Sequence, residues 1–249
     1  ITAIVPVHVW GNAVDLEDLV PICKERNIQI IEDASEGLGT VYKKGKYKKK
    51  HVGTIGLAGC LSFNGNKIIT TGGGGMILTD SENLATQARY LTTQAKDDPT
   101  YYIHDNIGYN FRLTNIQSAI GVAQLEQLSG FIRNKKLIFQ RYSESILKNK
   151  NFKIADVPDY SNNNHWISML YILSKEDNLN RDSLIAKFEK KKIYPRPIWA
   201  LNHFQKPYIN CQHYYVDNAI KLVENSLCLP SSSMLSKVEA DAVLEVLND

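Results

Sequence analysis

The sequence predicts an α/β fold with a mostly parallel β-sheet, followed by a smaller α/β domain. Short apolar segments alternate with helix-like segments through residues 1–80, as in a sheet whose strands are joined by helices. An acid, Asp33, and a lysine, Lys67, follow two of these apolar segments. Open α/β sheets bind ligands at the carboxyl ends of their strands, so the sequence predicts a functional site at that edge.

The elements of the predicted sheet follow one another along the chain. Residues 1–9 are apolar almost throughout, which predicts a strand covered on both faces. Asp15 can cap a helix that runs to about Arg26, and Pro21 predicts a kink or a late start in it. The remaining elements are three strands and a helix, predicted at Ile28–Glu32, Ala58–Phe63, Met76–Thr79 and Ser81–Leu91.

A lysine-rich segment from Tyr42 to His51 is the one charge run of the chain. Its lysines and tyrosines could contact phosphates and stack on bases. A solvated hairpin that turns at Gly45 explains the same residues and is the favoured interpretation. We therefore expect no nucleic-acid partner.

The later part of the chain predicts more helix. Residues 94–110 form an irregular polar loop, and residues 114–148 a long amphipathic helix or a helix pair with weak points at Gly121 and Ser129–Gly130. A turn at Asn162–Asn164 precedes the remaining elements. These are a strand and three helices, predicted at His165–Leu173, Arg181–Lys192, Tyr215–Leu227 and after the capping box of Ser236 and Glu239.

The composition is that of a soluble globular protein, with 43% hydrophobic and 22% charged residues. A net charge of +3 argues neither for nor against an acidic partner. No apolar run is long enough to cross a bilayer, so we expect a cytoplasmic protein without a membrane partner. The four cysteines lack the spacing of a zinc site and are expected to be reduced thiols without metal: Cys23, Cys60, Cys211 and Cys228.

The segment Gly59–Gly75 carries the most specific chemistry. Lys67 lies in a polar turn, with Ser62 five residues before it and the glycines Gly72–Gly75 after it. A lysine amine attacks a carbonyl only when deprotonated, and burial beside a cofactor is a usual way to achieve this. Glycines let the backbone approach a bulky ligand. A lysine for a Schiff base and an acid for a pyridinium nitrogen are the minimum set for pyridoxal phosphate chemistry.

Five motifs, in order, resemble the DegT/DnrJ/StrS family of pyridoxal-phosphate-dependent sugar aminotransferases: Pro6–Gly11, Glu32–Glu36, Ser62–Lys67, Thr71–Gly75 and Gly108–Thr114. The resemblance covers essentially the whole chain and is strongest up to about Gln124. It implies an aspartate-aminotransferase-like fold (fold type I). Family members carry a further N-terminal portion, so the resemblance also implies an N-terminally truncated chain. Residues 1–128 would be the remainder of the large cofactor-binding domain, and residues 129–249 the long helix and the small C-terminal domain.

The resemblance implies cofactor roles for several residues, each with a simpler alternative. Lys67 would form the Schiff base and move a proton, or be a surface lysine. Asp33 would face the pyridine nitrogen, or cap the turn after its strand. Ser62 would donate to the cofactor phosphate, or pack in the core. Asn110 would reach the phosphate in a neighbouring subunit, or occupy a turn.

Three further residues have less specific roles. Glu36 stands where the family often has glutamine or histidine beside the cofactor ring, and it could also be a simple loop acid. Arg196 and Trp199 belong to a segment that resembles the part of the family that closes over the sugar nucleotide. They could bind a diphosphate and a sugar, or pack between domains.

The resemblance implies a homodimer that transfers an amino group from glutamate to a nucleotide-linked keto-sugar. The expected substrate is a UDP-linked 4-keto-6-deoxy-N-acetylhexosamine for surface polysaccharide or glycan biosynthesis. Gly73 indicates this choice. The commoner family motif has an acid at this position, whereas members that resemble the branch making nonulosonic (legionaminic) acid precursors have glycine there, as this chain does. A deoxygenating branch has histidine in place of the lysine, which Lys67 disfavours. The alternative is a catalytically incomplete fragment that acts only as a sugar-nucleotide-binding or oligomerising module.

Overall fold

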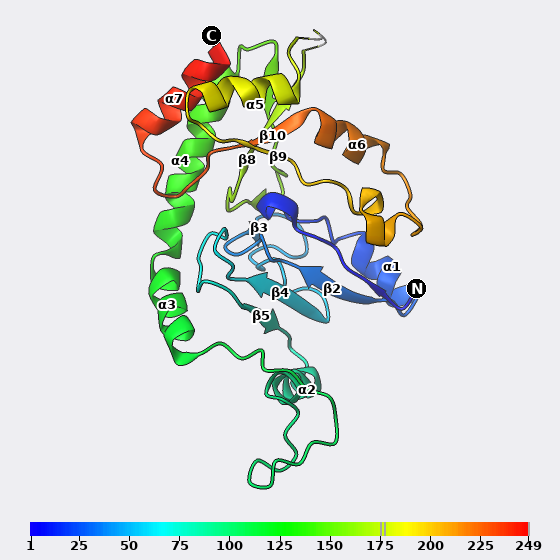
Figure 1. The fold of residues 1–249 in the computed structure, drawn as a ribbon. Coiled ribbons are helices and arrows are strands. Elements are labelled where there is room, and N and C mark those ends of the chain that lie inside the picture. The colour runs from blue at the N-terminus through cyan, green and yellow to red at the C-terminus, as the bar shows by residue number, and fades with distance from the viewer. Residues whose placement is uncertain (175, 177, 249) are drawn as a thin grey trace. The chain divides into compact units, whose positions relative to one another are not determined.

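Two units of the chain each contain a sheet and a hydrophobic core (Figure 1). The computed structural model describes residues 1–174, 176 and 178–248. The first unit comprises residues 1–132 and 157–166, and the second contains the rest. The domain boundary expected after residue 128 stays a prediction.

The sheet of the first unit has the strand order β1-β2-β4-β5. Its strands are β1 Ala3–Ile4, β2 Gln29–Asp33, β4 Ala58–Ser62 and β5 Gly75–Leu78. The first three strands are parallel, and β5 is antiparallel to β4. The predicted mostly parallel sheet is therefore confirmed, and the carboxyl ends of β2 and β4 lie at the same edge.

The strand predicted over residues 1–9 is much shorter in the structure. β1 contains two residues, and beyond it Val7 makes only an isolated bridge to Asp33. Pro6 has no N–H to donate, although its carbonyl accepts the N–H of Asp33 at 2.9 Å. Val5 is 57% exposed and Val7 41%, so this segment is not covered on both faces as predicted.

The helices of the first unit are η1 Val9–Gly11 (a 3-10 helix), α1 Leu19–Glu25, α2 Glu82–Thr92 and α3 Asn115–Glu126. Asp15 does not cap α1 as predicted, because the N-cap is Asp18 and the Asp15 carboxylate accepts the N–H of Glu17 at 3.0 Å. α1 starts late, because Pro21 is tolerated in a first turn where its missing N–H has no helical acceptor. The Ser81 hydroxyl caps α2 by accepting the N–H of Leu84 at 3.3 Å. Gln127 separates α3 from α4 (Leu128–Ile146), so the helix pair is the alternative that the structure shows for residues 114–148. The predicted weak points at Gly121 and Ser129–Gly130 lie inside the two helices.

The lysine-rich segment folds back on itself as predicted. Gly45 has a φ of 70°, and Val41 forms a bridge with His51. Strand β3 (Val41–Tyr42) also pairs with β7 (Ser161–Asn162), which attaches residues 157–166 to the first unit. The sequence does not predict this pairing, because it joins two strands of two residues each that are far apart in the chain.

The second unit contains an antiparallel sheet with the order β6-β8-β10-β9. Its strands are β6 Phe152–Ile154, β8 Ser168–Ile172, β10 Ser226–Leu229 and β9 Arg196–Pro197. Besides the part of α4 from Arg133 onwards, it contains the helices α5 Arg181–Lys190, α6 Asp217–Glu224 and α7 Lys237–Asn248, and the 3-10 helices η2 Asn202–Phe204 and η3 Lys206–Tyr208. None of the helices described is long and apolar enough to span a bilayer.

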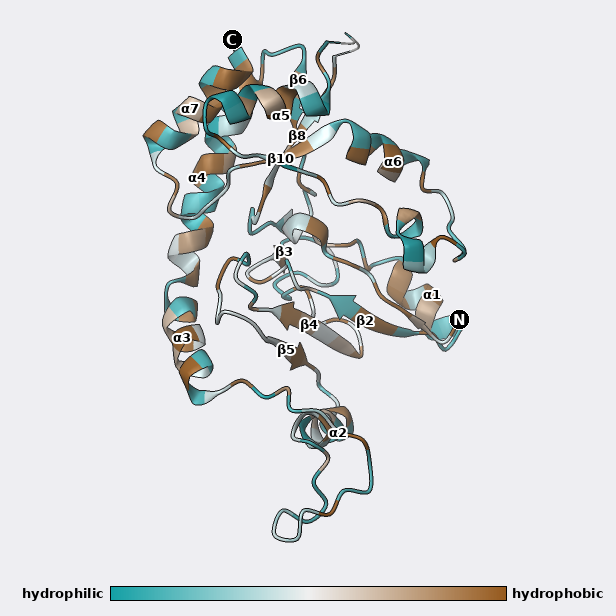
Figure 2. Ribbon diagram, viewed as in Figure 1, coloured by the Kyte–Doolittle hydropathy of each residue, from teal (hydrophilic) through white to brown (hydrophobic). Residues whose placement is uncertain are grey.

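Amphipathic helices supply the core of the second unit. α4, α5 and α7 alternate brown and teal along their lengths in Figure 2, and α4 buries Ile138, Tyr142 and Ile146. Tyr142 is fully buried, and its hydroxyl donates to the carbonyl of Pro230 at 2.9 Å. The predicted capping box holds α7, since the N–H of Ser236 and the Glu239 carboxylate meet at 2.8 Å.

A buried carboxylate on β2 links three segments of the first unit. Glu32 is fully buried, and its Oε2 accepts from Nε2 of His8 at 2.9 Å. Nδ1 of His8 accepts the N–H of Val14, so His8 is the neutral tautomer that donates from Nε2. Three backbone N–H groups also donate to Glu32, at 2.6–2.7 Å, from Gly53, Ile55 and Gly56. Burial alone would raise the pKa of Glu32, but the His8 and amide hydrogen bonds together lower it below its ordinary value.

Replacing this carboxylate should strongly destabilise the protein. Glu32→Gln replaces one carboxylate oxygen by an NH₂ group. This group faces N–H donors, so a buried N–H is left without an acceptor. We therefore expect a loss of about 3 kcal/mol in the free energy of unfolding at pH 7. Urea unfolding measures the loss, with the exposed Glu25→Gln as matched control. Because folding lowers the pKa of Glu32, its contribution to the free energy of unfolding is fully present above the unfolded pKa. This contribution is lost as the pH falls through the folded pKa. A variant as stable as the wild type at pH 7 would contradict this role.

A buried lysine marks the second unit. Lys135 on α4 is 7% exposed, and its Nζ donates to the carbonyl of Ser231 at 2.5 Å. Desolvation by burial lowers the pKa of Lys135 to about 8. The charged form is therefore disfavoured in the folded protein.

Stability should rise with pH in the window set by Lys135. Between the folded pKa of about 8 and the unfolded value of 10.5, the unfolded chain binds more protons, so the free energy of unfolding should increase by about 2 kcal/mol from pH 8 to pH 10. Lys135→Met should lack this increase, and the exposed neighbour variant Lys136→Met should retain it. The measurement is chemical denaturation across the window, read as the difference between variants so that tyrosine titration cancels. Equal pH slopes in all three proteins would refute the assignment.

Candidate active site

The carboxyl ends of β2 and β4 place two predicted site residues at one sheet edge. Asp33 ends β2 and Ser62 ends β4. Asp33 is in register with Cys60, and the N–H of Ala34 donates to the Cys60 carbonyl at 2.9 Å. Figure 2 shows this end of β2 as a teal tip on a brown strand. An acid and a hydroxyl thus lie on adjacent strand ends, where an α/β sheet binds ligands.

Lys67 lies in a hydrogen-bonded turn directly after β4. Its backbone N–H donates to the carbonyl of Asn64 at 3.0 Å, and the N–H of Thr71 closes the loop on the carbonyl of Phe63 at 3.0 Å. Ile69 is 2% exposed and anchors the turn in the core. The turn therefore holds the lysine backbone at a fixed place beside the sheet edge.

The amine of Lys67 has two neighbours of different chemistry. Its Nζ is 3.6 Å from Oε1 of Glu36 and 4.3 Å from the centre of the Trp166 ring. The side chains of Lys67 and Glu36 are 13% and 14% exposed. The structure thus brings Glu36 to Lys67, whereas no ion pair to Asp33 is found within the described residues.

Glu36 is a partly desolvated acid in a fixed orientation. Its Oε2 accepts the N–H of Trp10 at 2.7 Å. Burial raises the pKa of Glu36, the Trp10 hydrogen bond and the Lys67 charge act against this, and the Asp33 charge adds to the rise. The net pKa is raised, so this carboxyl can take up a proton more readily than an exposed glutamate.

Asn164 and Trp166 belong to the site but were not among the predicted site residues. Asn164 is fully buried, and its side-chain NH₂ donates to the carbonyls of Glu36 and Leu38 at 2.7 and 2.9 Å. Trp166 donates from Nε1 to the carbonyl of Asn66 at 2.8 Å. The asparagine run predicted only a turn, and nothing in the local sequence indicates which distant loop it contacts.

The predicted strand His165–Leu173 starts later than expected. His165 has a φ of 52°, a left-handed conformation incompatible with a strand, and β8 begins at Ser168. The N–H of Trp166 instead donates to Oδ1 of Asn164 at 2.9 Å. This local bond directs Trp166 to the site instead of into the sheet of the second unit.

The remaining predicted residues lie outside this contact group. Asn110 is exposed and forms a backbone bridge with Thr93. Arg196 lies on β9, which pairs with β10, and Trp199 follows it at 47% exposure, both in the second unit. Their roles in binding stay predictions.

The residues at this edge fit pyridoxal phosphate by their chemistry. A lysine amine, an acid at a strand end and a hydroxyl at the next strand end are the groups that bind its aldehyde, its ring nitrogen and its phosphate. Gly65, Gly72 and Gly73 have no atom within 4 Å of the position that a Cβ would take, so the turn leaves room beside the lysine. Gly72 has a φ of 80°, which explains the requirement for glycine.

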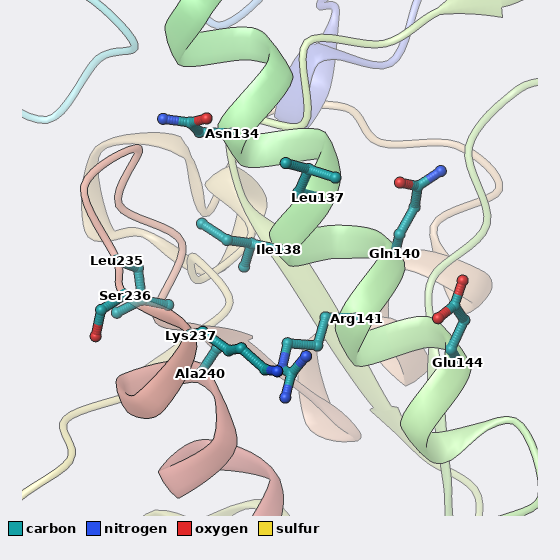
Figure 3. A pocket seen from close by; sticks show the side chains of 10 residues that line it. All are labelled: Asn134, Leu137, Ile138, Gln140, Arg141, Glu144, Leu235, Ser236, Lys237 and Ala240. Carbon is teal, nitrogen blue, oxygen red and sulfur yellow. The ribbon is translucent and has the colours of Figure 1, made fainter.

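Two hollows lie apart from the residues of the candidate active site. One, of about 540 Å³, is in the second unit between α4 and the start of α7, and Figure 3 shows Asn134, Arg141 and Lys237 around it. The other, of about 530 Å³, lies in the first unit against β4, β5 and α2. Neither is lined by a predicted site residue. In the part of the chain that the structure describes, no group of three or more metal-ligating side chains occurs.

Known proteins resemble the chain along its whole length. The sequence profile of the DegT/DnrJ/EryC1/StrS aminotransferase family matches residues 1–248. EpsN of Bacillus subtilis strain 168 is 34% identical over 251 residues, which cover 98% of this chain and 62% of EpsN. The GDP-perosamine synthase of Escherichia coli O157:H7 is 34% identical over 247 residues, which cover 99% of this chain and 65% of the synthase. The chain thus spans slightly less than two thirds of these relatives.

Solved structures share the fold. PseC of Helicobacter pylori, an aminotransferase involved in the biosynthesis of pseudoaminic acid, superposes with a TM-score of 0.87 at 22% identity, over 99% of this chain and 66% of PseC. This similarity confirms the aminotransferase fold predicted from the sequence.

Proposed function

The chain belongs to the DegT/DnrJ/EryC1/StrS aminotransferase family, and we propose that it is a pyridoxal-phosphate-dependent sugar aminotransferase in which Lys67 binds the cofactor covalently. One observation carries the proposal. The Lys67 amine lies 3.6 Å from Glu36, in the turn that follows the strand ending in Ser62 and beside the strand ending in Asp33. This arrangement provides an amine, an acid and a hydroxyl at the edge where α/β sheets bind ligands.

Each residue has a definite task in this proposal. Asp33 would hold a proton on the pyridine nitrogen by charge pairing, and Ser62 would donate to the phosphate. Asn110 would reach the phosphate of a neighbouring subunit. The bound cofactor supplies an electron sink for negative charge on the substrate carbon. Lys67 Nζ would move a proton between that carbon and the C4′ carbon of the cofactor.

The substrate in this proposal is a nucleotide-linked keto-sugar, with glutamate as amino donor. Support comes from the family and from the relative named GDP-perosamine synthase. The finer proposal is a UDP-linked 4-keto-6-deoxy-N-acetylhexosamine. Arg196 would contact its diphosphate, since a guanidinium binds phosphate oxygens in a bidentate manner, and Trp199 would lie against the sugar or base.

A homodimer is part of the proposal. Large apolar side chains are exposed along one stretch of the first unit, from the loop before α3 into α3 itself. Ile107, Phe111, Ile116 and Leu125 are 83%, 70%, 75% and 54% exposed, and α3 buries none of its residues. Such a concentration is unusual on a monomer surface and supports a subunit interface that includes the region of Asn110.

Covalent attachment at Lys67 is directly testable. Protein incubated with pyridoxal phosphate should absorb in the visible range, and borohydride reduction followed by peptide mapping should find the phosphopyridoxyl group on Lys67. Lys67→Ala should remove both signals, whereas the exposed Lys24→Ala should keep them. A group on another side chain, or no label on the folded wild type, would refute the aminotransferase proposal and favour a sugar-nucleotide-binding or oligomerising module.

A substrate panel tests the finer proposal. With glutamate as donor, the UDP-linked keto-sugar should yield 2-oxoglutarate and an amino sugar faster than a GDP-linked 4-keto-6-deoxyhexose. Arg196→Gln should raise KM about tenfold, because one charged phosphate contact is worth about 1.4 kcal/mol or more. Arg26→Gln is the control. Faster turnover of the GDP-linked sugar would replace the UDP assignment, and an unchanged KM would remove Arg196 from the binding site.

A further inference from the structure

The Lys67 amine is bound by a carboxylate and by an aromatic face. Oε1 of Glu36 lies 3.6 Å from Nζ, and the Trp166 ring centre lies 4.3 Å from it. Trp166 is 3% exposed and Lys67 13%, so water is largely excluded from both contacts. A desolvated aromatic face and a carboxylate both favour a cation.

The same asparagine sets the position of both partners. The Asn164 side chain donates from Nδ2 to the Glu36 carbonyl at 2.7 Å and accepts the Trp166 N–H on Oδ1 at 2.9 Å. Trp166 is also fixed to the lysine turn, because Nε1 donates to the Asn66 carbonyl at 2.8 Å. Glu36 and Trp166 are thus held by hydrogen bonds that do not involve the Lys67 amine.

Both neighbours of the Lys67 amine are groups that bind an ammonium. The neutral amine, and not the ammonium, is the nucleophile that attacks a carbonyl. A transaminating lysine alternates between covalent attachment and a released state, in which it must stay close to the substrate carbon. The observed contacts fit the released state.

We propose that Glu36 and Trp166 form a receiving site that binds the released ammonium of Lys67 between its periods of covalent attachment. The inference rests on the proposed function. Trp166 acts in it as a positioning residue, since it acts through Lys67. The Asp33 charge, from β2, is the other ionised group acting on Glu36 and belongs to the same electrostatic environment.

Reactivity of the Lys67 amine in protein prepared without cofactor gives the test. Competitive acylation over a pH series, read by mass spectrometry on the Lys67 peptide with exposed Lys24 as internal reference, measures it. Trp166→Leu should make acylation of Lys67 near neutral pH about three- to tenfold faster, because the ammonium loses the aromatic face. Glu36→Gln should make it about tenfold faster, because the ammonium loses the carboxylate.

Two matched variants separate the ring face from other effects. Trp166→Phe keeps an aromatic face but loses the hydrogen bond to Asn66, so it should stay close to the wild type. Tyr102→Leu removes the ring under Lys96, another cation–aromatic pair of the first unit, and should leave Lys67 unchanged. An unchanged acylation rate of Lys67 in folded Trp166→Leu, or an equal increase in Trp166→Phe, would overturn the role of the ring.

The Glu36→Gln result stands even where Trp166→Leu does not fold, since glutamine can still accept the Trp10 N–H. An acylation rate of Lys67 that is the same in this variant as in the wild type would overturn the receiving site. Failure of the inference is distinguishable from failure of the proposed function. If pyridoxal phosphate labels Lys67 but its acylation rate does not respond to the variants, only the receiving site is refuted. If Lys67 is not labelled, the proposed function is refuted together with the role that rests on it.

Discussion

The Glu32 carboxylate is the constraint on which the first unit depends. A charge with no exposure to water is tolerated only because four N–H donors surround it, from His8 and from three amides that lead into β4. These donors come from segments before β2 and after it, so they can converge only when β2 is correctly placed between them. Side chains alternate along a strand, and burying Glu32 therefore turns its neighbour Asp33 to the opposite face of the sheet.

The site follows from this placement in short steps. Beyond Asp33 the chain turns at Ser35, whose N–H is held by the Asp33 carboxylate at 3.0 Å, and reaches Glu36. Glu36 is then fixed from two sides, by the Trp10 N–H on its carboxylate and by Asn164 on its carbonyl. The lysine turn comes from the neighbouring strand. Two adjacent strand ends and one returning segment thus suffice to position the Lys67 amine.

Local patterns predicted the main helices and the sheet of the first unit, but they missed the short strands β6, β9 and β10, and the helix predicted as far as Leu227 ends at Glu224, before β10. The caps at Ser81 and Ser236 and the late start of α1 at Pro21 follow from short-range hydrogen bonding, which a sequence displays directly. The sequence also predicts that Lys67, Asp33 and Ser62 lie near one another, because the carboxyl ends of neighbouring parallel strands share one edge of the sheet. Trp166 lies about a hundred residues from the lysine it contacts, and its position depends on a left-handed His165 that no local motif signals.

The Lys67–Glu36 pair is better explained by function than by stability. At 3.6 Å the two charges are farther apart than the roughly 2.7–2.9 Å of a strong charge-assisted hydrogen bond, while both side chains have lost most of their hydration. Under these conditions desolvation consumes much of the Coulomb attraction, and the pair adds little to the folded state. An apolar pair of similar volume would fill the same space without that penalty. The pair, in a loop that Asn164 holds fixed, is therefore better suited to the proposed receiving site, which Lys67 leaves and to which it returns, than to a purely structural role.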